Sequence, residues 1–363
     1  MPKETAAIRG SEAGFRLGEE HGYHYGRCEA LLRSIPPAEY QAWPLRVLFI
    51  PQGFPAIDCG IISALTKQSA ELIVGQQTDL AGQAAAHQPD LLLVMNGLHT
   101  FPATLVEELN TVRGMGIPSA VWFADDPYFT DFTVELAPHF DYVFTHELGC
   151  IELYRGAGCR QVHYLPLAAN LEVFRPRPAG MNYRADLCFI GTGFWNRIEL
   201  FDRLTPFLRG KKVIIAGGMW DRLKHYKKLA SSIISEGIPP EQTPFYYSGA
   251  KIVINLHRSW KPGPDNRNSR GVPALSINPR TFEMSACGTF QLTDLRHDLP
   301  SYYVPGSEVG VFQTTDELIA KIEYYLRHEE QRKEAALRAL GRTAREHSYD
   351  NRVHRLLHAV FGG

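Results

Sequence analysis

Arg280 and Glu283 stand three residues apart in a short segment that has the features of a capped helix. Asn278 is a favourable N-cap, Pro279 suits the first helical position, and Gly288 can end the helix in a left-handed conformation. Residues three apart project from neighbouring points of one helical face. A guanidinium near a helix N-terminus and a carboxylate one turn later suit a phosphate joined to a hydroxyl-rich sugar. An ordinary surface ion pair is the alternative.

Two glycine turns lie nearer the N-terminus, each directly after an apolar stretch. In the first, Gly191 and Gly193 precede a segment that contains Arg197. Glycines here would let backbone N–H groups approach a phosphate, and Arg197 would add positive charge. A tight strand-to-helix turn is the alternative. The turn lacks the third glycine of a dinucleotide fingerprint, which disfavours a dehydrogenase. A second turn at 217–218 is equally ambiguous, but two such turns together favour a nucleotide pocket.

The glycine turns and the charged residues lie between short apolar runs that alternate with amphipathic stretches, and these elements determine where the residues lie in the fold. This alternation predicts parallel α/β structure, and strands that are apolar throughout predict sheets with helices on both faces. In such sheets ligands lie beyond the C-terminal ends of the strands. The expected strands are 45–50, 71–74, 90–95, 118–123, 141–144 and 161–164 in the first half, and 186–190, 212–216, 252–255, 289–292 and 309–312 in the second.

A stretch rich in proline and polar residues, 168–184, separates the two halves and predicts an interdomain linker. We therefore divide the chain into an N-terminal helical extension (1–44), a first Rossmann-like domain (45–172) and a second (173–363). Within the extension, the glycine-interrupted residues 11–34 are expected to form a helix packed on the main body.

Composition excludes several classes of function. With 38 basic and 39 acidic residues among 363, the chain has no general attraction for nucleic acid or anionic membranes. Six cysteines show no zinc-like spacing and are expected to be free thiols of a cytoplasmic protein. The sequence has no apolar signal segment and no stretch of membrane-spanning length. We expect a cytoplasmic enzyme whose phosphate binding is local.

The capped segment, read as N-x-R-x-F-E-x-x-A-C-G-x-F, resembles the helix that holds the ribose of a nucleotide sugar in GT-B glycosyltransferases. Its form is similar to the CgeB-like spore-maturation glycosyltransferase family. Segments 122–127, 146–166 and 189–197 extend the resemblance, which covers most of the chain from about residue 45. It implies an α/β, GT-B architecture of two Rossmann-like domains with parallel sheets facing across a cleft. It also implies that the last helix crosses back to the first domain and that no metal is needed.

The resemblance places the nucleotide sugar on the second domain. Within it, Tyr247 is expected to stack on the base or to pack in the core, and Lys251 to reach a phosphate. The long polar loop 258–276 is a donor or acceptor loop, with simple mobility as the alternative. The residues expected to bind the donor are Gly191, Gly193, Arg197, Tyr247, Lys251, Asn278, Arg280 and Glu283.

Three residues of the first domain are candidates for a catalytic base. Asp126 belongs to the adjacent pair 125–126 after an apolar strand, and one member of that pair would cap the next helix. His146 follows the next strand and would bind a sugar or hydrogen-bond a helix start. Asp58 is the third, because inverting enzymes of the resembled fold often carry their base in the first domain. Leu275 replaces a glutamate of related retaining families, which leaves the stereochemistry open.

The function expected from these features is transfer of a sugar from a UDP-, GDP- or TDP-sugar to a hydroxyl of a glycan, protein or small-molecule acceptor. No tightly bound cofactor and no metal are expected. Two alternatives stay open, a nucleotide-sugar epimerase of the same fold and a two-lobed binding protein without chemistry.

Overall fold

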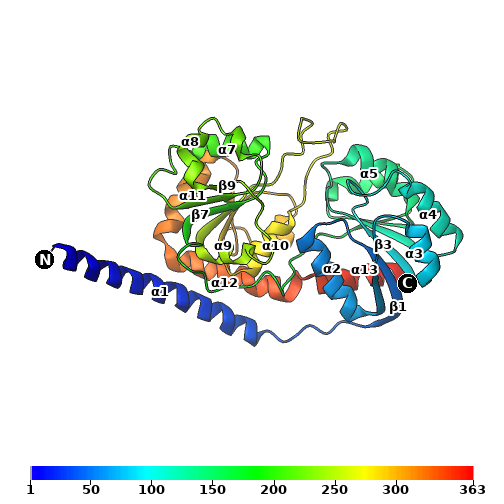
Figure 1. Cartoon of the computed structure of the whole chain (residues 1–363), viewed down its shortest axis with the longest axis horizontal. Helices are drawn as coiled ribbons and strands as arrows, with labels where there is room; N and C mark the ends of the chain where they lie inside the picture. Colours follow the sequence, from blue (N-terminus) through cyan, green and yellow to red (C-terminus); the bar gives the residue numbers. More distant parts are fainter. Residues whose placement is uncertain (1, 363) are drawn as a thin grey trace.

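The computed structural model describes residues 2–362, and the side chains of all of these except 2–9, 13 and 17 (Figure 1). Residues 1 and 363, which the expected extension and second domain include, lie outside the described part. Two six-stranded parallel sheets stand beside each other, each covered by helices. A long helix, α1 (Pro2–Ser34), precedes them.

The first sheet has the strand order β2-β1-β3-β4-β5-β6. Its central strands are buried at every position, as their unbroken apolar sequence predicts. The strands are β1 (Trp43–Ile50), β2 (Ser69–Val74), β3 (Leu91–Met95), β4 (Ser119–Phe123), β5 (Tyr142–Thr145) and β6 (Gln161–Tyr164). The helices between them are α2 (Pro55–Gln68), α3 (Leu80–His87), α4 (Leu105–Gly114), α5 (Thr130–Leu136) and α6 (Ile151–Gly156).

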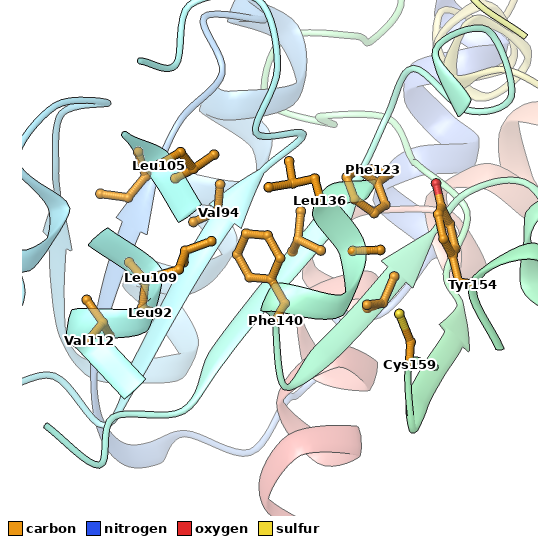
Figure 2. Packing of buried hydrophobic residues seen from close by; sticks show 14 of the residues in the cluster. Leu92, Val94, Leu105, Leu109, Val112, Phe123, Leu136, Phe140, Tyr154 and Cys159 are labelled. Atoms are coloured by element: carbon orange, nitrogen blue, oxygen red, sulfur yellow. The ribbon is translucent and has the colours of Figure 1, made fainter. Parts of the chain in front are cut away.

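Alternate residues of each strand in this sheet enter two different cores. Leu92 and Val94 of β3 pack with α4 on one face, where Figure 2 shows them beside Leu109 and Phe140. Residues of the opposite parity, such as Leu93, pack instead with α2 and with the last helix, α13 (Tyr349–Phe361). This period of two is the ordinary consequence of strand geometry.

The second sheet has the order β12-β11-β10-β7-β8-β9 and contains every strand expected from the sequence, together with a two-residue strand, β9, that was not expected. The strands are β7 (Ala185–Ile190), β8 (Val213–Ala216), β9 (Ile233–Ile234), β10 (Ala250–Asn255), β11 (Gln291–Asp294) and β12 (Gly310–Phe312). The helices are α7 (Trp195–Leu204), α8 (Tyr226–Leu229), α9 (Thr243–Gly249), α10 (Pro279–Ala286), α11 (Thr315–Arg327) and α12 (Glu329–Glu346).

Two segments of the second half cross to the first. Helix α13 packs on α2, where the ring of Tyr349 fills the space that a side chain at position 60 would need. Loop 258–276 reaches α5, and its residue Val272 enters the core of the first domain. The loop is fixed there by backbone hydrogen bonds from Arg267 N to Tyr128 O (2.7 Å) and from Asp131 N to Arg267 O (3.0 Å). The loop is therefore anchored on both domains.

The C-terminal part of α1 packs on the body of the molecule. His24 contacts Gly288 O through Nε2 (2.8 Å), and Arg27 forms ion pairs with Glu330 and Glu334 of α12. The earlier part of the helix projects beyond the second sheet, and the Phe15 side chain there is largely exposed (Figure 1). The expected helix is therefore present, and among the side chains that the structure describes, those that contact the main body lie in its C-terminal part.

Candidate functional site

A cavity of about 730 Å³ lies between the two sheets, at the C-terminal ends of their strands. Its walls come from the start of α2, the loops after β4 and β5, the turn after β7, the loop before α9, and the start of α10. Parallel α/β sheets bind ligands at this edge, because the loops that follow the strands meet there. This cavity is the candidate active site.

Helix α10 is capped as its sequence predicts and brings two charged side chains to the cavity. The Asn278 side chain accepts a hydrogen bond from Thr281 N (3.1 Å), and Gly288 has a φ of 66° beyond the helix end. The Asn278 side chain also donates to Asn255 Oδ1 (3.0 Å). Asn278 borders the cavity, but these bonds occupy its side chain in holding α10 on β10. Arg280 and Glu283 face the cavity from the first turns.

Glu283 is 8% exposed, and no hydrogen bond or ion pair reaches its carboxylate from any described residue. Burial raises its pKa to about 7, and Arg280 offsets only part of that rise. A buried carboxylate without partners is unfavourable in an apolar surrounding. Two hydroxyl groups of a ligand would supply the hydrogen bonds that the protein does not.

Three arginines, Arg197, Arg258 and Arg280, bring positive charge to the cavity. Arg197 is 4% exposed and donates to Leu256 O (3.0 Å) and Thr192 O (2.9 Å). Burial, and then the neighbouring Arg280, lower the pKa of Arg197 to about 9. Arg258 also borders the cavity, with its guanidinium over the rings of Tyr128 and Phe194. Within residues 2–362 none of these three arginines forms an ion pair, so their charge is available to an anionic ligand.

The two glycine turns pack against each other, which corrects the expected role of their N–H groups. Gly191 N donates to Ala216 O (2.7 Å) and Gly193 N donates to Gly218 O (2.8 Å). A Cβ atom on Gly193 would lie 2.7 Å from Met219 O. The glycines therefore permit close contact between turns, and the N–H groups of Gly191 and Gly193 are not free to bind phosphate. The turn contributes Thr192 to the cavity wall.

Tyr247 and Lys251, expected to bind the donor, lie in different places. Tyr247 is 1% exposed, packs in the core and also borders the cavity. Lys251 is near the start of β10, at the opposite edge of the sheet, and pairs with Asp186 (2.8 Å). Because strand β10 separates it from the cavity, Lys251 cannot reach a ligand there. This corrects the expectation that it binds a phosphate.

Asp126 and Asp58 are structural in this molecule, which corrects their expected role as bases. Asp126 is fully buried, away from the cavity, and accepts hydrogen bonds from Tyr154 (2.7 Å), Thr145 (2.6 Å) and Thr133 (3.2 Å). Asp58 accepts from the backbone N–H groups of residues 52–54, and so holds the loop before α2. Neither carboxylate borders the cavity.

His146 does border the cavity. It is 5% exposed, and both ring nitrogens are shielded from solvent without a hydrogen bond of ordinary geometry from a described residue, although backbone groups of 124 and 126 lie near the ring. Burial lowers its pKa to about 4, so the ring is neutral at pH 7 and offers one donor and one acceptor. This is the state that suits a sugar hydroxyl. Its role as a ligand stays a prediction.

Three residues that were not chosen as site residues border the cavity. Asp125 is the other member of the pair 125–126, Arg258 begins the loop 258–276 that was expected to bind donor or acceptor, and His257 precedes that loop. His257 Nδ1 lies 2.5 Å from Asp294 Oδ1, and its Nε2 accepts from Asn278 N (2.9 Å). Asp125, His257 and Arg258 follow the C-terminal ends of predicted strands, and this position alone would have predicted that they border the ligand site. Residues 237–240 also border the cavity, but nothing in their sequence indicates this, because their position depends on how the chain folds after β9.

Within residues 2–362, no helix has both the length and the apolar character needed to cross a membrane. The same residues contain no group of three or more His, Cys, Asp or Glu side chains arranged to hold a metal ion.

Comparisons of sequence connect the chain to known proteins. A family model described as glycosyl transferase-like matches residues 197–358, which include Arg197, Arg280 and Glu283. The spore protein CgeB of Bacillus subtilis (strain 168) is 28% identical over 317 residues, or 84% of this chain and 96% of that protein.

Solved structures show the same arrangement of two domains. HepE of Anabaena, in a complex with UDP and glucose, matches with a TM-score of 0.60 at 11% identity, over 88% of this chain and 100% of its own. Sucrose-phosphate synthase from Thermosynechococcus elongatus matches with a TM-score of 0.58 at 11% identity, over 87% and 99% of the two chains. At these identities the likeness concerns the fold alone.

Proposed function

We propose how a sugar donor is held in this chain, which is a glycosyltransferase of the CgeB-like family with the GT-B fold. The observation that carries the proposal is Glu283, a buried carboxylate without partners at the cavity. It accepts hydrogen bonds from the two ribose hydroxyls of a nucleotide sugar. Charge-assisted bonds of this kind are roughly twice as strong as neutral ones, which compensates for burial of the carboxylate.

The diphosphate of the donor lies against Arg280 and Arg197. Both guanidinium groups face the cavity without ion pairs from the described residues, and Arg197 is fixed by bonds to two backbone carbonyls. Negative charge develops on the leaving diphosphate as the sugar departs. Cations held in place before the reaction stabilise that charge without reorganisation. We assign this role to the arginines, with no metal ion.

The base of the donor occupies the end of the cavity formed by 237–240, Thr243 and Tyr247. This end adjoins Glu283, and its walls are mainly apolar, so the base would be held by packing and backbone contacts. We propose a UDP-sugar, because HepE, which shares the fold, was solved with UDP. GDP- and TDP-sugars are the alternatives that an experiment must separate.

The acceptor enters from the first domain, where His146 offers a neutral ring to a sugar hydroxyl. The acceptor hydroxyl, on a glycan, a protein or a small molecule, displaces the nucleoside diphosphate from the anomeric carbon. We also propose a cytoplasmic location, since all six cysteines are free and activated sugars are available there. The family and relatives described above do not support an epimerase or a binding protein without chemistry.

The proposal is tested by a thermal-shift and calorimetric panel of UDP, GDP, TDP and CMP with their sugar conjugates. We expect selective stabilisation by UDP and a UDP-sugar, and its loss in Glu283→Ala. The matched control is Glu323→Ala, since Glu323 is an exposed residue of α11. Equal affinity of the wild type and Glu283→Ala for the selected nucleotide would contradict the ribose-binding role.

A further inference from the structure

The loop after β3 has an unusual backbone. Asn96 and His99 adopt φ angles of 60° and 58°, and Gly97 adopts 69°. For residues other than glycine this left-handed region is uncommon, and such conformations are often kept at functional sites. The loop is fixed by Gln52, whose side chain donates to Leu98 O (2.7 Å) and accepts from Leu98 N (3.1 Å).

This loop holds the carboxylate of Asp125. Asn96 Nδ2 donates to Asp125 Oδ2 (2.9 Å), and His99 Nε2 lies 2.8 Å from the same oxygen. The other end of the Asn96 amide accepts from Ala124 N (3.0 Å) and Asp125 N (3.1 Å). Hydrogen bonding to Asp125 raises the pKa of His99. Both bonds thus reach one carboxylate oxygen, and within residues 2–362 no hydrogen bond reaches the other, Oδ1.

Asp125 and Glu283 are the two acidic residues that border the cavity in the described structure. They stand on opposite walls, one from each domain. Glu283 lies beside Arg280 of the second domain, whereas Asp125 comes from the first domain and has Arg258 near it, so Asp125 is the carboxylate that faces the acceptor. Position 275 carries leucine, whose backbone N–H donates to Glu147 Oε1 (2.8 Å) in the contact between the domains.

We propose that Asp125 is the general base of the transfer reaction, and that His99 and Asn96 are positioning residues that hold it. As the acceptor oxygen attacks the anomeric carbon, its proton passes to Asp125 Oδ1. The bond from that carbon to the diphosphate oxygen breaks, and the nucleoside diphosphate leaves with the electron pair beside Arg280. This single displacement inverts the configuration at the anomeric carbon. The inference rests on the proposed function, because it requires the donor in this cavity.

The test uses water as the acceptor, so that no natural acceptor is needed. The nucleotide sugar selected by the binding panel, UDP-glucose first, is incubated with the wild type, Asp125→Asn and the exposed control Asp316→Asn, and released UDP is measured. We expect Asp125→Asn to bind the donor within about twofold of the wild type. Its hydrolysis rate should fall by about 10²–10⁴-fold, the usual contribution of a general base. Asp316→Asn should match the wild type.

The positioning role of His99 is tested by rescue. His99→Gln keeps an N–H group that can reach Asp125, whereas His99→Ala removes it. We expect a larger fall in kcat for His99→Ala than for His99→Gln, with the KM for the donor unchanged in both. A merely structural role would lower folding stability and kcat together in both variants.

The anomer released first, read by proton NMR before mutarotation, gives an independent check. Release of the inverted anomer supports the proposal. Release of the donor's own anomer, or hydrolysis by Asp125→Asn at the wild-type rate, would overturn it. A wild type that binds the donor but releases no nucleotide would also overturn it. Failure of every nucleotide to bind would instead overturn the proposed function, so the two failures are distinct.

Discussion

Asp126 and Glu283 are both buried carboxylates, but their surroundings are opposite. Three hydroxyl groups, from Thr133, Thr145 and Tyr154, donate to Asp126. No described residue donates to Glu283, which faces a cavity large enough for a ligand. Burial raises the pKa of Asp126 to about 6 and that of Glu283 to about 7.

The difference separates a structural carboxylate from one reserved for a ligand. A buried polar group is tolerated where hydrogen bonds replace those it made to water. Around Asp126 the protein provides these bonds itself, and they tie the turn after β4 to β5, α5 and α6. At Glu283 they are absent, so the apo protein keeps an unfavourable group that a ligand would stabilise. A raised pKa alone does not distinguish the two cases, because burial is its main cause in both.

Loss of the Asp126 carboxylate should have the largest effect on stability. Asp126→Ala leaves three buried hydroxyl groups without their acceptor, and each such group costs about 1–3 kcal/mol. We expect the free energy of unfolding to fall by about 3–5 kcal/mol, measured by urea denaturation. Asp126→Asn keeps one acceptor oxygen and should lose less.

The exposed control Asp316→Ala should change stability by less than about 0.5 kcal/mol. An Asp126→Ala protein with wild-type stability but no activity would reverse our assignment and restore Asp126 as a catalytic candidate.

Removal of the Glu283 carboxylate should affect binding instead. Glu283→Gln replaces two charge-assisted bonds to ribose by weaker ones, so the Kd for UDP should rise about 10–100-fold. The 2′,3′-dideoxy analogue of UDP lacks both hydroxyls and should bind the wild type and the variant equally weakly. Calorimetry with both nucleotides on both proteins gives a double-mutant cycle. Equal loss of affinity for both nucleotides would mean that Glu283 acts on the fold of the site and not on the ribose.

The raised pKa of Glu283 predicts a pH dependence of stability. The native state binds a proton at this residue more tightly than the unfolded chain, whose value is near 4.5. Protonation of Glu283 therefore stabilises the folded state fully at pH values below about 4.5, and this contribution is lost as the pH rises through about 7. Glu283→Gln cannot ionise, so at pH 8 it should be more stable than the wild type by about 1–3 kcal/mol. At pH 5 the two proteins should be nearly equal.

This gain would appear in urea denaturation at a series of pH values, with Glu323→Gln as the control that follows the wild type. A stability difference between the wild type and Glu283→Gln that does not vary with pH would show that the Glu283 carboxylate is already satisfied in the apo protein.

The fold was predictable from the sequence because its signals are local. Strands β3 and β4 are apolar at every position, which predicts burial on both faces. Helix α10 carries its own N-cap and terminating glycine, so its limits and the placement of Arg280 and Glu283 followed from the residues themselves. Strand β9 was missed because two residues carry no pattern.

The first-domain side of the site could not be predicted in the same way. Asp125 and Asp126 are adjacent in the turn that follows β4, so which of the two side chains faces the cavity depends on the packing around both. Asp126 is held in the core by residues 133, 145 and 154, and Asp125 is held at the cavity by residues 96 and 99. These contacts are distant in sequence.

Lys251 extends the comparison to a charge outside the cavity and should show the smallest effect. Its position near the start of β10 directs it to Asp186, at the edge of the sheet opposite to Glu283. We expect Lys251→Met to change the Kd for UDP by less than about twofold, and stability by about 0–1 kcal/mol, the usual contribution of an exposed ion pair. Arg280→Met is the matched comparison, since the same loss of positive charge at the cavity should weaken UDP binding at least about tenfold. If both variants lose affinity equally, long-range charge and not contact determines binding, and the assignment of the diphosphate to Arg280 fails.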